Sequence, residues 1–565
     1  MDQKEIKETA TWLLYEKGRN FHRETNIYTD TDRNYRFYSD NQWEGVKLGD
    51  IEPLQENFIE PTVKYKLAVL FSNLYAINYS SMNFGNTDVA KMAKHYTKML
   101  NRYAAQVWER DKMDDKCYTA AEDAAINDEG IIYIDFDDEK LLPINELVDK
   151  NDIYYGDENS PDIQSQPYIL IRKRMPLSKA IKYAEDNGVS DTDLIIADTD
   201  TFDQSGDAAK HEVDNQVTLV FKFYKDNETV HFSVSSRLVD IVEDIDIGIS
   251  LYPIAHFNWK NKKGSARGEG EVRNLIPNQI EVNKILMRMV LTSKLQSYPR
   301  TVVDTEKILN PEALNSVGSI IKTKGNAVDD VRKVVGTIPP AQMSADVMTL
   351  KESIINNSRE LAGAGEAATG QVDINSTTSG RAVLAVQQAA QAPLNIQKER
   401  FKSFIEDIAK IWLEYLIAYS KKGVDLEYEH DDETVEVIRV SQKTLRDLQA
   451  VVKIDITPRS SFDKFAQEQT LENMFVQGLF SPQRAPELKG YVEALDDDSV
   501  SPKQKLQKIV ANNDREQMRI AKINARAQML QQQAQQFFMQ DADTQAQQLA
   551  DEQIKRNAIN TASAV

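Results

Sequence analysis

Residues 268–283 read GEGEVRNLIPNQIEVN, and they stand at the centre of the stretch that decides the fold. The glycines lead out of a predicted strand, and an apolar helix is predicted over Ile276–Ser297, with Pro277 in its first turn. A compact insertion of strand and turn sequence follows, and then a second helix over Ser344–Leu361. A loop rich in Gly, Ala, Thr and Ser, Ala362–Ser379, comes next. Two helices joined by an insertion indicate a mechanical part rather than an active site.

The first of these helices carries apolar residues around much of its circumference. A stripe at helical spacing is widened by further aliphatic residues, and together they comprise Ile276, Ile280, Val282, Leu286, Met287, Val290, Leu291 and Leu295. Such a wide apolar surface needs neighbours on more than one side. The pattern by itself predicts a helical hairpin.

The bulk composition favours an ordinary globular protein that lacks the motifs of common enzymes. Of its 565 residues, 41% are apolar and 28% are charged, and the net charge is −20. Cys117 is the only cysteine, no Gly-Lys pair of a phosphate-binding loop occurs, and the six histidines are scattered. We therefore expect a protein that is not an enzyme and has no cofactor, no metal and no membrane span.

The first half of the chain predicts helices followed by strands. Residues 1–130 read as helices with polar connectors, including a helix over Val63–Tyr79. After Gly130 the apolar period changes, and a small β-rich domain is predicted over about 131–260. The fold class is therefore expected to be α+β.

The second half predicts mostly helix, so the α+β fold is expected to be mainly helical. A long helix is predicted over Gly380–Ser420, and Pro393 should kink or divide it. A short β element follows, with strands predicted at Leu426–Tyr428, Val435–Val440 and Val451–Ile456. The chain then turns helical again, and its Gln-rich stretch, residues 528–548, predicts a long helix or a frayed tail.

Two other functional classes fit parts of the sequence. Asp135, Asp137 and Asp138 follow a predicted strand and could supply oxygen ligands to Mg²⁺ in a metal-dependent nuclease. An acidic turn after a strand is also common surface decoration. The Gln-rich end would instead suit a helical scaffold or adaptor protein that mediates assembly.

The order of the elements resembles the portal proteins of tailed bacteriophages over most of the chain. The most specific piece is the Gly-x-Gly…Pro-Asn-Gln…Asn pattern within residues 268–283. The other pieces are Gly130–Phe136, Asp152–Tyr155, Arg172–Lys182, Tyr252-Pro253-Ile254 and the Ala362–Ser379 loop with the long helix after it.

This resemblance implies a portal fold with wing, stem, clip, tunnel loop and crown. Carried over to this chain, the parts are wing 1–275, stem helix 276–297, clip 298–343, second stem helix 344–361, tunnel loop 362–379, wing 380–458 and crown 459–565. The crown includes the Gln-rich end, which is less standard in the family.

The resemblance also implies a function and partners. Portal proteins form a dodecameric ring at one capsid vertex of the virion, and double-stranded DNA passes through its channel during genome packaging and ejection. Large terminase, major capsid or scaffolding protein, and adaptor or tail proteins are the implied partners. The protein would be present in the host cytoplasm during assembly.

Charge distinguishes the implied tunnel loop from the implied stem and clip. The loop contains no Lys or Arg, and its residues of interest are Gly363, Gly365, Glu366, Gly370 and Asp373. A loop without bases would let phosphates pass, because each neutralised phosphate adds a salt-dependent attraction. Candidate contacts with the DNA backbone are Lys284 and Arg288 on the stem, and Lys322 and Lys324 on the clip. Each of these cations could instead form a salt bridge between subunits.

Overall fold

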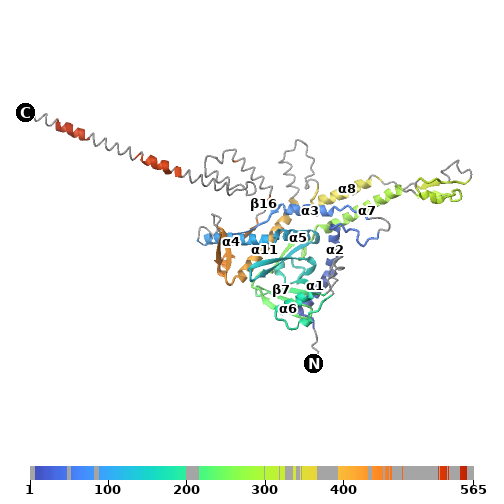
Figure 1. Ribbon diagram of the computed structural model, residues 1–565, viewed down its shortest axis with the longest axis horizontal. Coiled ribbons are helices and arrows are strands. Elements are labelled where there is room, and N and C mark those ends of the chain that lie inside the picture. Colours follow the sequence, from blue (N-terminus) through green and yellow to red (C-terminus); the bar gives the residue numbers. More distant parts are fainter. Residues whose placement is uncertain are drawn as a thin grey trace, which may run out of the picture. The chain divides into compact units, whose positions relative to one another are not determined.

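The computed structural model divides the chain into two compact units, Met1–Pro458 and Arg459–Val565. Figure 1 shows the elements of each unit along the sequence. In the first unit the structure describes residues 7–47, 53–81, 88–198, 215–297, 300–316, 318–324, 335–338, 344, 346–365, 392–429, 435–449 and 452–456. In the second unit it describes residues 459–460, 474, 519–520, 522–530, 532 and 547–556.

The helices of the first unit follow the predicted apolar periods only in part. Thr9 begins the first of them, because its side-chain oxygen accepts a hydrogen bond from Trp12 N at 3.2 Å. The helices are α1 (Ala10–Glu24), α2 (Ile27–Tyr38), α3 (Ile59–Leu70), α4 (Asp88–Arg110), α5 (Met113–Asn127), α6 (Leu177–Asp186), α7 (Val272–Ser297), α8 (Asp346–Leu361), α11 (Asn395–Tyr419) and α12 (Gln442–Gln449).

Two antiparallel sheets form the centre of this unit. A three-stranded sheet has the order β10-β3-β4 and consists of Ile254–Asn258, Glu129–Asp137 and Leu142–Val148. A five-stranded sheet has the order β5-β6-β7-β8-β9 and consists of Ile153–Tyr155, Tyr168–Pro176, Gln216–Asp226, Thr229–Ser235 and Asp240–Asp246. The structure therefore mixes helix and strand, which is compatible with an α+β fold.

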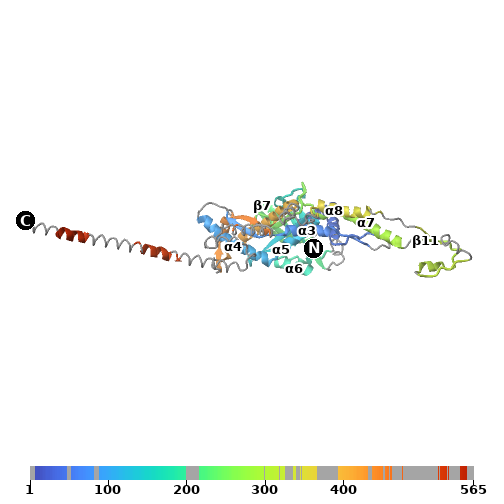
Figure 2. The same cartoon turned by 90° about the horizontal axis from the view of Figure 1, so that it is seen from above.

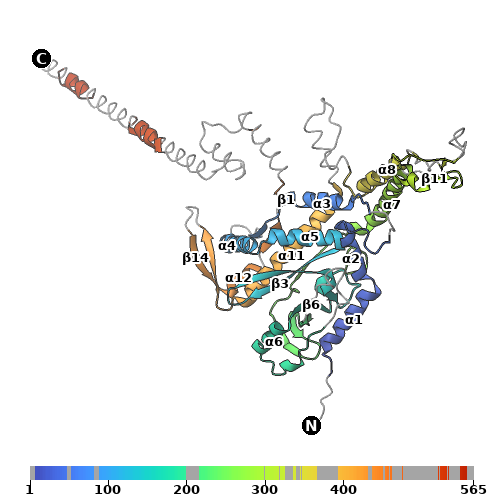
Figure 3. The same cartoon turned by 45° about the vertical axis from the view of Figure 1, so that its right-hand side comes forward.

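The two sheets pack against each other between layers of helices, as Figures 1 and 3 show. Tyr133 of β3 contacts Phe223 of β7, with ring centroids 5.5 Å apart, so this face of the three-stranded sheet meets the five-stranded sheet. Phe136, on the opposite face of β3, stacks on Tyr415 of α11. Helix α5 also packs on β3. Helix α1 covers the outer face of the five-stranded sheet through a cluster of Trp12, Tyr15, Tyr154, Leu170 and Val220.

The predicted helix Val63–Tyr79 is wrong in its second half. Helix α3 ends at Leu70, and strands β1 (Asn73–Leu74) and β2 (Ile77–Ser81) follow. Strand β2 pairs with β15 (Val452–Ile456), and Tyr79 N donates to Asn101 Oδ1 at 2.6 Å. Because this partner strand is more than 370 residues away along the chain, local apolar spacing gave no sign of it.

The β-rich region contains one strand that was not predicted. Strand β9 has four exposed residues in a row at its end, Glu243–Asp246, and its acidic composition does not resemble a strand. It forms because β8 offers a partner edge, with Val234 opposite Val242. The β element near the end of the unit also differs, since β13 (Val424–Glu429) and β14 (Val435–Val440) pair together while β15 pairs with β2.

The predicted long helix appears in the structure as α11, which begins two residues after Pro393. Pro393 lies in a short 3-10 turn, η9 (Ala392–Leu394), directly before this helix, so it does not kink α11, and its division of a longer helix stays a prediction. Residues 380–391 of the predicted helix lie outside the described residues.

The described parts of the second unit are strand β16 (Arg459–Ser460) and helical residues. Among the latter, Ile520, Ile523, Met529, Leu530, Leu549 and Ile554 are exposed. Most of the predicted crown lies outside the described residues. Across the described helices of both units, none combines the length and the apolar character that a membrane crossing requires.

Candidate functional site

The candidate site is the helical hairpin of α7 and α8, which lie side by side in Figures 2 and 3. Helix α7 begins at Val272, four residues earlier than predicted. Pro277 therefore lies beyond the first turn, and it leaves the carbonyl of Arg273 without its usual helical donor. Between the two helices, β11 (Arg300–Val303) and β12 (Val335–Ile338) form an antiparallel ribbon.

The start of α7 approaches the end of α5 so closely that two positions admit only glycine. A Cβ atom on Gly268 would lie 2.7 Å from Asp128 O, and one on Gly270 would lie 2.9 Å from Ala125 O. The same approach allows Gly270 N to donate to Asp128 Oδ1 at 2.6 Å. The Gly-x-Gly of the sequence pattern thus serves close backbone packing at the root of the hairpin.

A buried carboxylate beside these glycines adds ionic contacts. Glu271 forms salt bridges with Lys66 (2.8 Å) and Lys260 (3.0 Å), and it accepts a hydrogen bond from Trp259 Nε1 at 3.2 Å. Burial opposes ionisation of Glu271, but the two lysines outweigh it and hold its pKa below the usual value. Glu271 therefore remains charged and ties the root of α7 to α3.

Amide side chains of the Pro-Asn-Gln…Asn pattern form a second connection, which we call the amide clamp: Gln279, Asn283 and Gln42. Gln279 Oε1 accepts from Phe58 N (3.1 Å), and Gln279 Nε2 donates to Asn283 Oδ1 (3.0 Å). Asn283 Nδ2 in turn donates to Gln42 Oε1 at 2.6 Å. All three side chains are buried, so each hydrogen bond satisfies a group that would be costly to leave unpaired.

Helix α8 has its own contacts at the same root. Asn278 Nδ2 donates to Ser358 Oγ at 2.9 Å, which joins α7 to α8. Lys351, a buried lysine of α8, forms a 2.6 Å ion pair with Glu56. Both helices are therefore held on the segment that connects α2 to α3.

The far end of the hairpin contrasts with its root. Leu291 and Leu295 of α7 are 41% and 40% exposed. On the ribbon, Val302 and Ile338 are also exposed. The wide apolar surface predicted for α7 is thus buried near its start and uncovered near its end.

A buried ion network lies just before the hairpin, and no sequence motif indicated it. Arg267 bonds to Glu129 (2.5 Å), to Glu158 through two nitrogens (2.9 and 3.0 Å) and to His22 Nε2 (2.7 Å). Burial opposes ionisation of Glu129, yet Arg267 and His256 lower its pKa to about 2. The histidines looked scattered in sequence, but the network brings His22 and His256 together.

The candidate DNA-contact residues are exposed, and the structure does not gather them into one site. Lys284 forms a 2.7 Å ion pair with Glu281 one turn away, and this contact lowers the pKa of Glu281. Arg288 is exposed one turn further along α7. Lys322 and Lys324 are exposed between the hairpin helices, where their backbones bond to Leu309, Asn310 and Lys307.

Of the predicted tunnel loop, the structure describes residues 362–365. Gly363 adopts a φ of 74° and donates to Glu360 O (2.9 Å), while Ala364 N donates to Arg359 O (2.8 Å). These are the two hydrogen bonds of a Schellman cap at the end of α8. Gly363 thus ends a helix, a role that the Leu-Ala-Gly sequence could have signalled. Glu366, Gly370 and Asp373 lie outside the described residues.

The aspartates of the nuclease alternative do not form a metal site. Asp135 is exposed on β3, and it accepts a hydrogen bond from Phe136 N at 2.8 Å. Asp137 pairs with Lys140 at 2.8 Å. Within the part of the chain that the structure describes, no group of three His, Cys, Asp or Glu residues could hold a metal ion.

Comparison with known families gives one match. The model of the phage P22-like portal protein family matches residues 241–562, a range that includes the hairpin and its root. No curated protein matches the chain.

Proposed function

The chain belongs to the P22-like phage portal protein family, and we propose that it forms a ring at one capsid vertex through which the phage genome is packaged and ejected. The ring is dodecameric, as the family resemblance implies, and it is the docking platform for large terminase and for adaptor or tail proteins. The observation that carries the proposal is the hairpin, whose root is buried and whose far end exposes apolar side chains.

The exposed far end supports a ring. Fully covering a leucine side chain is worth about 1.5 to 3 kcal/mol, so Leu291 and Leu295 favour association. In a ring each hairpin would contact a different surface of its neighbour, and this heterologous interface closes by rotation. A neighbour would thus supply the second side that the wide apolar surface of α7 needs.

The charges support a conduit for DNA. In the proposed ring Lys284, Arg288, Lys322 and Lys324 make sparse contacts with phosphates, and the tunnel loop, residues 362–379, projects towards the DNA without binding it. Because the loop has no Lys or Arg, it adds no counterion-release term to DNA affinity. The duplex would then slide instead of being gripped.

Electron microscopy and mass photometry of the purified full chain test the ring. We expect rings for the wild type and monomers for the double variant Leu291→Glu with Leu295→Glu. Leu13→Glu is the matched control, because Leu13 is 55% exposed on α1, away from the hairpin. Monomers of the wild type under several salt concentrations, or rings of the double variant, would contradict the proposed interface.

A packaging assay tests the conduit separately. Deletion of residues 365–377 should leave ring assembly intact while DNA packaging or retention declines. Neutral variants of Lys284 and Arg288 should also change retention, and they should flatten its dependence on salt. Loss of the ring on deletion would give the loop a structural role, and unchanged retention would leave the two cations as salt-bridge residues.

A further inference from the structure

Strand β10 has one edge that no strand pairs with among the residues that the structure describes. Its backbone alternates between groups that face β3 and groups that face away. Pro253 O accepts from Ile134 N (2.9 Å), and Trp259 N donates to Asp128 O (3.1 Å), so the odd-numbered residues bond to β3. The N–H and C=O groups of His256 and Asn258 therefore point to the opposite side.

These outward groups have no partner among the described residues, whereas both ends of the edge are closed. Ile254 N already donates to Tyr252 O at 2.8 Å. Before the open part, Gln164 bonds to both the N–H and the C=O of Tyr252. After it, Asn261 pairs with Gly268 in an isolated bridge. The open edge is thus limited to the five residues of β10.

The opposite edge of the same sheet is blocked. Side chains from the turn between α4 and α5 bond to the outer backbone of β4: Arg110 donates to Pro143 O (2.7 Å), and Lys116 donates to Asn145 O (2.8 Å). Asp111 Oδ2 accepts from Asn145 N at 3.3 Å. Such blocking prevents other chains from adding a strand, and β10 lacks it among the described residues.

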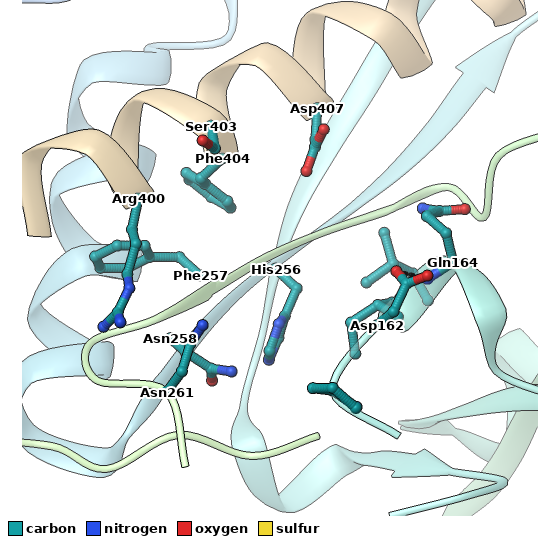
Figure 4. A pocket seen from close by; sticks show the side chains of 13 residues that line it. Asp162, Gln164, His256, Phe257, Asn258, Asn261, Arg400, Ser403, Phe404 and Asp407 are labelled. Carbon is teal, nitrogen blue, oxygen red and sulfur yellow. Dashed lines mark hydrogen bonds between the residues drawn. The ribbon is translucent and has the colours of Figure 1, made fainter. Parts of the chain in front are cut away.

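A cavity of about 330 Å³ lies along the open edge, between α11 and residues 161–164. Figure 4 shows that Arg400, Asn258 and Asn261 line one end of it, while Asp162 and Gln164 line the other. Phe404 of α11 supplies an apolar wall. The cavity leaves the outer side of β10 accessible beside α11.

The charges at the two ends have opposite sign. Arg400 donates one hydrogen bond to Trp259 O (3.1 Å), and no carboxylate partner for it is found among the described residues. Burial lowers its pKa, so a nearby anion would stabilise its charge. At the other end Asp162 lines the cavity, and so does Asp407, which lies two turns of α11 beyond Arg400 and already pairs with Lys410 at 2.9 Å. A ligand with an acidic and a basic group would match both ends.

We propose that the free edge of β10 binds an extended segment of a partner protein, which adds a fourth strand to the sheet. The segment spans about five residues at 3.3 Å each, with an acidic residue beside Arg400 and a basic residue beside Asp162 and Asp407. Main-chain hydrogen bonds to His256 and Asn258 supply the affinity, as in other cases of strand addition. None of these residues belongs to the α7–α8 hairpin on which the proposed ring rests.

Two labelled pentapeptides of equal composition test the proposal on the full chain: acetyl-Lys-Val-Thr-Val-Asp-amide and acetyl-Asp-Val-Thr-Val-Lys-amide. We expect one of them to bind by fluorescence anisotropy, and which one binds reports a parallel or an antiparallel added strand. N-methylation of its alternate backbone nitrogens should abolish binding. Amide exchange at His256 and Asn258 should slow on binding, while exchange at Ala255 and Phe257 stays the same.

Two variants separate the edge from the charges. Asn258→Pro removes an outward N–H but no bond to β3. It also removes the hydrogen bond from Asn258 Nδ2 to Ala266 O (3.0 Å), so Asn258→Ala, which removes that side-chain bond alone, is its control, and peptide binding should be lost only in the proline variant. Arg400→Gln should weaken binding by up to about fivefold, the range of an exposed ion pair, and Lys402→Gln on the same helix should not change it. If Asn258→Pro fails to fold, the N-methylated peptide and Arg400→Gln still decide the question.

Three results would overturn the proposal. The first is that neither peptide binds at about 1 mM, and the second is that the N-methylated peptide binds as well as the unmodified one. The third is that the backbone amides of His256 and Asn258 are already protected from hydrogen exchange in the peptide-free protein. Protection that depends on protein concentration would mean that a second copy occupies the edge, and protection that does not would mean that the chain covers its own edge.

Discussion

The two ends of α7 differ in how completely contacts within this one chain bury their side chains. Near the start, Gln279 and Asn283 are buried and fully engaged in the amide clamp. Near the end, Leu291 and Leu295 are each about 40% exposed. The same helix therefore combines a root that folding completes with a far end that only another molecule can cover. Substitutions at the root should change stability, and substitutions at the far end should change assembly.

The largest effect is expected for Gly270→Ala at the root. Its new Cβ would lie about 3 Å from three backbone atoms of α5 and its following turn, none of which can move alone. We expect a loss of about 3 kcal/mol in the free energy of unfolding, the upper range for overpacking. Urea unfolding of the wild type and the variant measures it.

Gly264→Ala is the matched control for this substitution. Gly264 has a φ of 67°, but open space surrounds its Cα, so only the left-handed conformation is penalised, at about 1 kcal/mol. If both variants lost the same free energy, close approach would not be the reason for glycine at position 270.

A smaller loss is expected when the amide clamp is broken without a change of volume. Gln279→Leu leaves Phe58 N and Asn283 Oδ1 without their partners, which should cost about 2 kcal/mol for the unpaired buried groups. Gln296→Leu, an exposed position on the same helix, should stay within about 0.5 kcal/mol of the wild type. Equal costs in urea unfolding would show that the clamp adds nothing to the hairpin root.

Much of the fold could be predicted because local patterns agree with it. The continuous apolar run of β3 and the helical period of α7 each determine their element without help from distant residues. Strands β2 and β9 could not be predicted, because β2 depends on pairing with β15 and β9 is an acidic strand on an available edge. Both strands form because of the strand each pairs with in the folded protein, and local sequence does not show that partner.

The candidate site shows the same division. The sequence singled out Gly268, Gly270 and the Pro-Asn-Gln…Asn pattern, but not why they are needed, because Asp128, Ala125 and Gln42 come from separate segments. The ion network of Arg267 was missed for that reason as well. Side chains that meet only through the fold leave no spacing signal in the sequence.

The ion network before the root should make stability depend on pH. His22 accepts a hydrogen bond from Arg267, its Nδ1 is buried without a partner, and Lys150 and Arg172 lie nearby. Burial first, and then these cations, lower its pKa well below 6.5. Below pH 6.5 the unfolded chain binds a proton that the folded chain does not, so the free energy of unfolding falls as pH falls.

The slope from this one group is at most about 1.4 kcal/mol per pH unit. Asp123 titrates with the opposite sign, because burial and Asp149 raise its pKa to about 7 and acid then favours the folded state. The measurement is therefore a difference: between pH 6.5 and pH 5, His22→Gln should lose less stability than the wild type, and Asp123→Asn should lose more. Parallel curves for all three proteins would remove His22 as the cause.

The smallest effect is expected for Lys284→Gln, towards the far end. The Lys284–Glu281 pair is about half exposed on both sides, and solvent screens such a pair, so its contribution to stability is small. At the root, Lys351→Gln should cost about 1 kcal/mol, because Lys351 is only 9% exposed in its pair with Glu56. A double-mutant cycle of each pair measures both values. A small stability cost for Lys284→Gln together with altered DNA retention would mean that the lysine serves the channel. A cost equal to that of Lys351→Gln would instead show that the pair of Lys284 with Glu281 stabilises the fold. The two ends of α7 would then differ less than their burial indicates.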